Sequence, residues 1–381
     1  MSEEKNFEYQ DLILVPKKEF LKSEEVIIET NEDSPCIWKE VDETFFPCKE
    51  LMNFYHEQQK VMWNLEEVEP KQIQHELAHF SELPIEIKAI IQSILLFFTQ
   101  ADKLVIENVN DLINHVPYKA ATYFYNLQNS VESGVHDRSY EFLARYYYNN
   151  DDLYKNDLIL LDSIIHESNP ERLAKNFGPD NLEFEFSKYQ CKYYDFKNGI
   201  EKKIFQAVAK KINIMNKCKR RTSIVEKLVS FMVLETIGFN PIFAIINSIK
   251  NNNKGLSFLS TVNDFVTIDE NIHARFGIEL YMNYCESKLP VERVHEIIKE
   301  IAEIEIDFLK NIFDPKLIIN SIDLDKYITY TKQITNTLSK TITNEILYHD
   351  LPELPVAFVT PQLQVKTNYF ERTIMGIHYI L

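Results

Sequence analysis

Apolar residues recur at spacings of three and four along most of this chain, a pattern typical of amphipathic helices rather than strands. Residues 83–112 carry the clearest example, with Pro84 near the expected start of the helix. Glycine, which weakens helices, occurs only seven times in 381 residues, and strand-like alternation is scarce. No stretch rich in proline, glycine or serine divides the chain. These features predict an all-α fold, built as a single helical bundle.

Further helices are expected at residues 120–148, 222–248, 263–286 and 291–313. Pro241 falls inside the second of these segments, where it predicts a kink or a local break. The first forty or so residues show no sustained periodicity. We therefore expect an N-terminal arm at 1–45, a helical domain at 46–360 and a C-terminal tail at 361–381.

Composition and short motifs exclude several classes of function. No GxGxxG or Walker A sequence occurs, so a phosphate-binding loop has no support. The net charge of −17 argues against a nucleic-acid partner, and the basic run at 217–221 is interpreted as a solvated helix end. The longest apolar run, 89–98, is too short to span a bilayer, and the acidic N-terminus lacks the order of a signal peptide. Five cysteines without a CxxC pair suit free thiols. A cytoplasmic protein with neither nucleic-acid nor membrane partners is predicted.

Four of the expected helices carry acids inside apolar stretches, and two of these acids are followed closely by a histidine. The order is an acid and then an acid with a histidine, written twice: Asp102, Glu132, His136, Glu235, Glu270 and His273. Four carboxylates would neutralise two divalent cations, and imidazole suits iron or manganese. Without cations, four buried carboxylates would be costly to keep ionised. The doubled set has the pattern of ferritin-like di-iron and di-manganese proteins.

Several motifs in order give the chain its resemblance to a known family, the small, radical-generating subunit of class I ribonucleotide reductase. They run from about residue 63 to residue 370: WNLEEV (63–68), LLFFTQAD (95–102), FYNLQNSVESGVHDRSY (124–140), LETIGF (234–239), IDENIH (268–273) and KTNYFE (366–371).

The resemblance implies a ferritin-like helical bundle with additional helices, in which the six side chains above hold two iron ions per chain. Manganese suits the same ligands. It also implies that Tyr140 is oxidised to a stable radical when the reduced metals react with O₂. Trp63 and Asp269, together with His136, would pass the oxidising equivalent to a large subunit, where ribonucleotides are reduced to deoxyribonucleotides. A homodimer is implied as well. The residues that match the apolar lining of the radical site are Phe239, Phe243 and Val266.

The first half-site departs from the family's usual E-x-x-H spacing. Ser133 stands three residues before His136, and Glu132 stands one residue further away. Either the ligand is lost at Ser133, or one extra residue is inserted at Gly134 and offset by a deletion before Tyr118. The position of FYNLQ favours the insertion. Residues three and four apart share a helix face, and a π-bulge absorbs an extra residue, which glycine tolerates best. We therefore expect Glu132 to be the ligand, in a locally widened helix.

Three other interpretations stay open. The string HELAH matches the zinc-protease motif H-E-x-x-H, although nothing nearby supplies a third ligand. A ferritin-like di-metal oxidase or oxygenase would share the bundle and the metals, but the retained Tyr140, Trp63 and Asp269 argue against it. A non-catalytic paralogue that only binds and regulates the large subunit is suggested by the shifted first ligand. Ile268, where the family commonly has an arginine, and the short C-terminus point the same way.

The end of the chain bears on radical transfer. In the family a flexible tail docks on the large subunit and carries a tyrosine that continues the radical path. Here only ten residues, RTIMGIHYIL, follow KTNYFE, and the usual acidic stretch is missing. Tyr379 is the one tyrosine beyond that motif, so it would have to serve, with Ile377, Ile380 and Leu381 anchoring the tail. An aromatic residue packed on the surface is the other interpretation of Tyr379.

Overall fold

The structure is a computed structural model that describes residues 28–29, 36–68, 73–148, 154–155, 157–158, 199–252, 255–313, 317, 319 and 323–354. Long helices dominate these residues, and the strands described are one two-residue parallel pair, β1 (Ile28–Glu29) with β2 (Ser287–Lys288). The predicted all-α fold is confirmed. The domain limits at residues 45 and 360 stay predictions.

Four helical segments form the centre of the bundle, and three of them contain a π-helical turn. They are α4 (Ile85–Ile113); α5 (Lys119–Val131) continued by η2 (Glu132–His136) and α6 (Asp137–Tyr148); α10 (Ile224–Val233) continued by η4 (Leu234–Gly238) and α11 (Asn240–Asn252); and α12 (Ser257–Glu279) ending in η5 (Leu280–Tyr284). The second segment packs on α4, and α12 packs on α10 and α11. A widened turn moves the following residues around the helix axis, so it changes which side chains face the centre.

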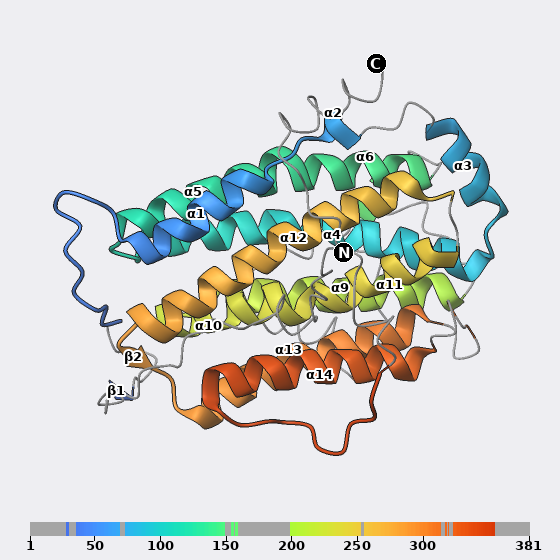
Figure 1. The fold of residues 1–381 in the computed structure, drawn as a ribbon. Coiled ribbons are helices and arrows are strands. Elements are labelled where there is room, and N and C mark those ends of the chain that lie inside the picture. The colour runs from blue at the N-terminus through green and yellow to red at the C-terminus, as the bar shows by residue number, and fades with distance from the viewer. Residues whose placement is uncertain are drawn as a thin grey trace, which may run out of the picture.

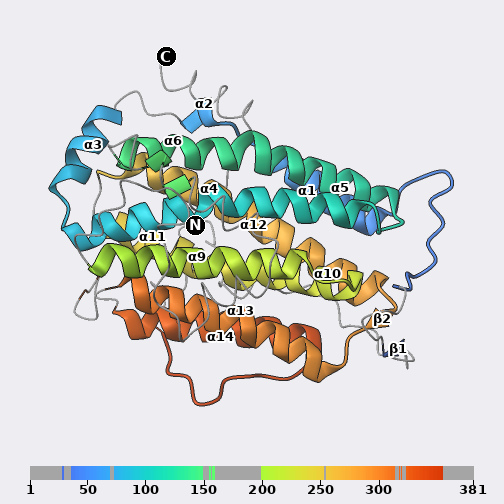
Figure 2. The same cartoon turned by 180° about the vertical axis from the view of Figure 1, so that it is seen from behind.

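The remaining helices cover this centre from two sides. Figures 1 and 2 show α13 and α14 along one long edge of the molecule and α1, α5 and α6 along the other. Helix α9 lies between α4 and α13, while α1 packs on α5 and α12. The bounds are α1 (Lys49–Val61), α2 (Leu65–Val68), α3 (Ile73–Glu82), α9 (Gly199–Lys219), α13 (Val291–Ile312) and α14 (Leu324–Thr343).

Local capping explains where several helices begin and end. Ser223 accepts a hydrogen bond from the backbone N–H of Glu226, which gives α10 the S-x-x-E start of a capping box. Asp323 accepts one from the N–H of Lys326 at the start of α14. That helix ends at Thr343, and the next residue, Asn344, has a φ of 62°, the left-handed conformation common after a last turn.

The predicted helices match these elements, with two informative differences. The segment predicted at 222–248 is one apolar run interrupted at η4, and Pro241 lies in the first turn of α11, where its missing N–H is tolerated. The helix expected from residue 263 begins at Ser257 instead. Its start is capped by Glu76, which is 182 positions from Phe258 and 183 from Leu259, so local signals could not reveal it.

Two helical stretches are long and apolar enough to cross a membrane, Ile85–Ile113 and Ile224–Ile249. In the most apolar stretch of each, 78% and 94% of the residues are buried inside the bundle. They therefore have the character of core helices in a soluble protein.

The four cysteines in the described residues, Cys36, Cys48, Cys218 and Cys285, are free thiols, as expected.

Candidate metal centre

The six acids and histidines of the doubled half-site meet in the centre of the bundle. They come from α4, η2, η4 and α12, and each is at most 4% exposed: Asp102, Glu132, His136, Glu235, Glu270 and His273. Two overlapping groups bring the ligand atoms of five of these residues within 4.8 Å of one another, and Glu235 belongs to neither group. One group is Asp102 with Glu132 and His136, and the other is Glu132 with Glu270 and His273, so Glu132 belongs to both.

The ring of His136 is held between the cluster and a separate acid. Its Nε2 lies 2.9 Å from Oδ2 of Asp269, while its Nδ1 lies 3.0 Å from Oε2 of Glu132 and 3.3 Å from Oε1 of Glu270. When Nε2–H donates to Asp269, the neutral ring carries a lone pair on Nδ1. That lone pair then faces two carboxylates, a set of acceptors that a metal cation bound among them would satisfy. A metal-bound histidine commonly donates its other ring N–H to a carboxylate in this way.

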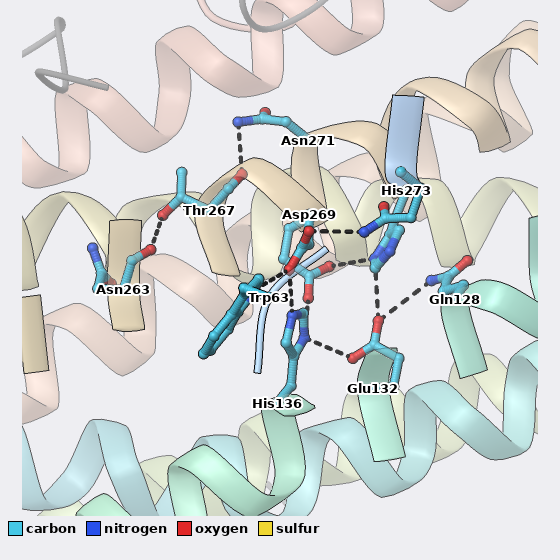
Figure 3. Close-up of polar contacts among 11 residues, drawn as sticks. Trp63, Gln128, Glu132, His136, Asn263, Thr267, Asp269, Asn271 and His273 are labelled. Atoms are coloured by element: carbon cyan, nitrogen blue, oxygen red, sulfur yellow. Dashed lines mark hydrogen bonds and ion pairs between the residues drawn. The ribbon is translucent and has the colours of Figure 1, made fainter. Parts of the chain in front are cut away.

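His273 repeats the arrangement from the other side of the cluster. Its Nδ1 lies 3.1 Å from Oε1 of Glu132 and 3.3 Å from Oε2 of Glu270. Figure 3 shows the two rings approaching Glu132 from different helices, with Asp269 above His136. Both histidines thus point Nδ1 at the same shared carboxylates.

Buried oxygens without hydrogen-bond partners complete the cluster. Both side-chain oxygens of Glu235 and Oδ2 of Asp102 are buried and receive no hydrogen bond. Burial, followed by the neighbouring Glu132, raises the pKa of Asp102 well above its usual value. Burial, followed by Glu270, does the same to the pKa of Glu235. Unpaired buried carboxylates are costly, and a bound cation removes that cost. The donor set of carboxylate oxygens and imidazole nitrogens therefore fits a pair of iron or manganese ions.

The π-helical turn η2 decides which residue of the first half-site faces the cluster. Glu132 is fully buried there, whereas Ser133 is exposed and donates its hydroxyl to the carbonyl of Asn129 at 2.7 Å. The expected local widening of the helix is confirmed by η2. The bulge does not require glycine at this position, because Gly134 has no positive φ and an added Cβ would meet nothing within 4 Å. Its place at the surface of the bulge leaves room for a side chain.

Tyr140 lies one turn after His136 and is enclosed by aromatic rings. It is 1% exposed, and its ring stacks on Phe98 with centroids 4.3 Å apart and planes 11° apart. Phe98 in turn lies 5.6 Å from Phe243 and 6.0 Å from Phe239. Burial, followed by the charge of Asp102, raises the pKa of the phenol well above its usual value. The phenol is therefore protonated at neutral pH and sealed from solvent.

Phe98 was missed from the sequence, where it is one of many apolar residues in LLFFTQAD. The available signal was its position one turn before Asp102, on the same helix face. Val266, expected in the same wall, is buried on α12.

A chain of hydrogen bonds runs outward from His136. Oδ2 of Asp269 accepts from Nε2 of His136 at 2.9 Å and from Nε1 of Trp63 at 2.8 Å. Its other oxygen accepts from Nε2 of Gln58 at 2.8 Å. Gln58 was missed from the sequence, because one glutamine in a polar helix gives no signal. The carboxylate is thus fully engaged although Ile268 stands where the family commonly has an arginine.

Comparison with known proteins decides the family. The family model "Ribonucleotide reductase, small chain" matches residues 43–161 and 196–354, which is most of the chain. The chain belongs to the ribonucleotide reductase small-chain family. The ribonucleoside-diphosphate reductase small chain of African swine fever virus (isolate Tick/South Africa/Pretoriuskop Pr4/1996) is 25% identical over 338 residues, covering 86% of this chain and 88% of that protein. The corresponding small chain of Plasmodium falciparum (isolate Dd2) is 26% identical over 328 residues, covering 85% and 79%.

Solved structures share the fold of this small chain. Dimanganese(II)-NrdF of Streptococcus sanguinis superposes with a TM-score of 0.58 at 15% identity, covering 85% of this chain and 98% of that one. Family membership makes the protein the small subunit of an oxidoreductase that has a large-subunit partner. Small chains of this family are soluble, bind a di-metal centre and generate the radical used in ribonucleotide reduction.

The HELAH string has a structural role in this ribonucleotide reductase small chain. Glu76 is buried, and its two carboxylate oxygens accept from the backbone N–H groups of Phe258 at 2.8 Å and Leu259 at 3.1 Å. It also accepts a short hydrogen bond from the hydroxyl of Tyr147 on α6. Among the described residues, the two metal-competent clusters both lie in the bundle centre and exclude this motif. The zinc-protease interpretation is therefore rejected.

Tyr379 and the tail at 361–381 lie outside the described residues, as does most of the arm at 1–45. Their expected roles stay predictions.

Proposed function

We propose that this chain is the radical-generating subunit of a class I ribonucleotide reductase, with the radical formed at Tyr140. The observation that carries the proposal is a sealed phenol, stacked on Phe98, within the electrostatic influence of the buried acids of the di-metal cluster. A tyrosyl radical survives only where solvent and reductants are kept away, which the low exposure of Tyr140 and its aromatic wall achieve. An oxidase or oxygenase would instead need a cavity for its organic substrate beside the metals.

The ligands we assign are the six buried acids and histidines of the centre: Asp102, Glu132, His136, Glu235, Glu270 and His273. When bound, a pair of iron or manganese ions would use dioxygen to supply the oxidant for Tyr140. The chain's own residues do the rest. Glu132 faces both histidines and so bridges the two halves, and Gln128 approaches it with Nε2 at 3.5 Å from Oε1. Among the acids of the centre, Asp102 has the largest effect on the pKa of the Tyr140 phenol, which it raises together with burial.

Transfer to the large subunit would use the hydrogen-bonded chain from His136 through Asp269 to Trp63. The three groups are joined by contacts of 2.9 and 2.8 Å, and the rings of Trp63 and His136 lie 6.2 Å apart. Gln58 fixes the free oxygen of Asp269, which keeps the carboxylate plane aligned with both donors. Tyr379, in the tail of this chain, would continue the path into the large subunit. We further propose a cytoplasmic homodimer, as the family resemblance implies, without nucleic-acid or membrane partners.

Metal loading tests the ligand assignment. Reconstituted with ferrous or manganous ions, the wild-type chain should bind a pair of ions, and comparison of the two loadings decides the metal. Glu132→Ala should lose at least one ion, because both histidine nitrogens face that carboxylate. Ser133→Ala is the matched control and should bind normally, because its hydroxyl only returns to the carbonyl of Asn129. Equal metal content in wild type and Glu132→Ala would overturn the assignment.

A non-catalytic paralogue remains the competing function. Assays of large-subunit binding, nucleotide reduction and the radical on the reconstituted wild-type chain distinguish the two functions. Such a chain would bind the large subunit without supporting nucleotide reduction or a radical. The Asp269 carboxylate accepts hydrogen bonds from Gln58, Trp63 and His136. This arrangement favours the active subunit, because a relay no longer in use would not need three aligned donors.

A further inference from the structure

Two thiols lie in contact where the N-terminal segment passes the end of α12. The sulfur atoms of Cys36 and Cys285 are 3.6 Å apart, although the residues are separated by 249 positions in the sequence. Cys36 precedes the segment that leads into α1, and Cys285 directly follows η5. A disulfide has an S–S length of about 2.05 Å. Closing the pair therefore requires the sulfurs to approach by less than about 2 Å, a movement within the reach of side-chain rotation.

The backbone around the pair is held in place by hydrogen bonds that do not use the thiols. The N–H of Lys39 donates to the carbonyl of Tyr284 at 2.9 Å, and the N–H of Glu286 donates to the carbonyl of Ile37 at 2.9 Å. Trp38 and Cys285 face each other in the antiparallel bridge that these bonds form. The two cysteines are consequently neighbours by virtue of the fold, whatever the state of their sulfur atoms.

We propose that Cys36 and Cys285 are a redox modification site, at which a peroxide drives formation of a reversible disulfide that fastens the N-terminal segment to the end of α12. Disulfides in reducing compartments are usually transient and redox-sensing, which is the kind proposed here.

The chemistry begins at Cys285. Its pKa is lowered by the hydrogen-bonding contact with Cys36 and by nearby Lys288, while the same contact raises the pKa of Cys36. The Cys285 thiolate attacks the O–O bond of the peroxide, an S–O bond forms, and the leaving hydroxide takes a proton to become water. Cys36 is partly exposed, so a small peroxide can reach the pair from its side.

The second step closes the bond. The Cys36 sulfur attacks the sulfenic sulfur of Cys285, the S–S bond forms, and the S–O bond breaks. The departing hydroxide accepts the Cys36 proton and leaves as a second water. The two thiols have then lost two electrons and two protons, and one hydrogen peroxide has been reduced to two waters. A dithiol reductant reverses the reaction by thiol–disulfide exchange.

The site is selective among the described thiols. Cys48 contacts the hydroxyl of Tyr284 at 3.1 Å, and Cys218 is buried on α9. Cys36 and Cys285 alone among the described cysteines have their sulfur atoms in mutual contact. The two others therefore serve as controls.

Peptide mapping of the full chain tests the proposal. The reduced protein is treated with hydrogen peroxide, blocked by alkylation, digested without reductant and analysed by mass spectrometry. We expect a linked peptide pair joining Cys36 to Cys285, which dithiothreitol removes. The link should be lost in Cys36→Ser and Cys285→Ser but retained in Cys48→Ser and Cys218→Ser. In Cys36→Ser, dimedone should label Cys285, because its sulfenic acid has lost the resolving thiol.

Two results would overturn the proposal. One is that both thiols remain fully alkylatable after peroxide treatment. The other is that either cysteine is linked mainly to a different cysteine of this chain or of a second copy. Cys36→Ser alters a partly exposed side chain, so it stays informative even where Cys285→Ser fails to fold.

Discussion

Replacement of Glu76 tests how the start of α12 is fixed. Its carboxylate accepts from the backbone N–H groups of Phe258 and Leu259 and from the hydroxyl of Tyr147. Glu76→Ala removes a helix cap, worth about 1 kcal/mol, and leaves buried donors unpaired at about 1–3 kcal/mol each. Because water entering the new space recovers part of this, we expect a loss of about 3–5 kcal/mol in the free energy of unfolding. Glu76→Gln keeps an acceptor oxygen and should cost about 1–2 kcal/mol.

Two assays read this prediction at different scales. Denaturant unfolding gives the free energy, with Glu82→Ala on the exposed face of α3 as a control that should change it by less than about 0.5 kcal/mol. Hydrogen exchange reports locally on the first turn of α12, where the amides of Phe258 and Leu259 should lose protection in Glu76→Ala. The reasoning is refuted if Glu76→Ala unfolds within about 1 kcal/mol of wild type and these amides exchange as slowly as before.

Three further predictions follow from individual contacts. Gly134→Ala should raise the free energy of unfolding by about 0.5–1 kcal/mol at unchanged metal content, since a Cβ fits there; a loss of metal would contradict this. Lys211→Met should cost about 3–5 kcal/mol by leaving buried Glu305 unpaired, and the double variant with Glu305→Leu should recover most of it. Burial raises the pKa of Glu305 to about 7 from 4.5 and lowers the pKa of Lys211 to about 8 from 10.5. The folded form therefore binds the Glu305 proton more tightly and the Lys211 proton more weakly than the unfolded form does. The contribution of this pair to the free energy of unfolding should fall as pH rises from 4.5 to 7, and it should increase again from 8 to 10.5. If the difference in the free energy of unfolding between wild type and the double variant does not change with pH, the prediction is refuted. Deletion of 376–381 should abolish nucleotide reduction while the metals and the radical stay intact. Tyr379→Phe should bind the large subunit normally but turn over poorly. Full activity of Tyr379→Phe would exclude Tyr379 from the radical path.

The centre of the fold could be predicted because its signals are periodic and repeated. Apolar spacing along residues 83–112 predicted α4 almost to its ends. The repeated acid and histidine pattern predicted six buried side chains, five of which lie in the two overlapping groups at the centre of the bundle. The irregular spacing of Glu132 could be interpreted because side chains at i+3 and i+4 share a helix face. An inserted residue can therefore keep the ligand on the same face if the helix widens locally, as it does at η2.

Contacts between distant segments could not be predicted in the same way. Glu76 looked like part of a zinc motif, yet the backbone N–H groups that it accepts from lie more than 180 positions later, at the start of α12. Gln58 holds Asp269 from another helix, and Phe98 stacks on Tyr140 across the bundle. Each is an ordinary residue type in an ordinary helix, and only the tertiary packing gives it a role.

Electron paramagnetic resonance of the iron-loaded protein tests the central claim most directly. After addition of ferrous ions and O₂, wild type should show a tyrosyl radical signal. Tyr140→Phe should bind the same amount of iron, because the hydroxyl that it removes has no hydrogen-bond partner among the described residues. It should show no such signal, because the residue that carries the radical is gone. A radical of unchanged shape and yield in Tyr140→Phe, or a wild-type chain that takes up no metal, would contradict the account.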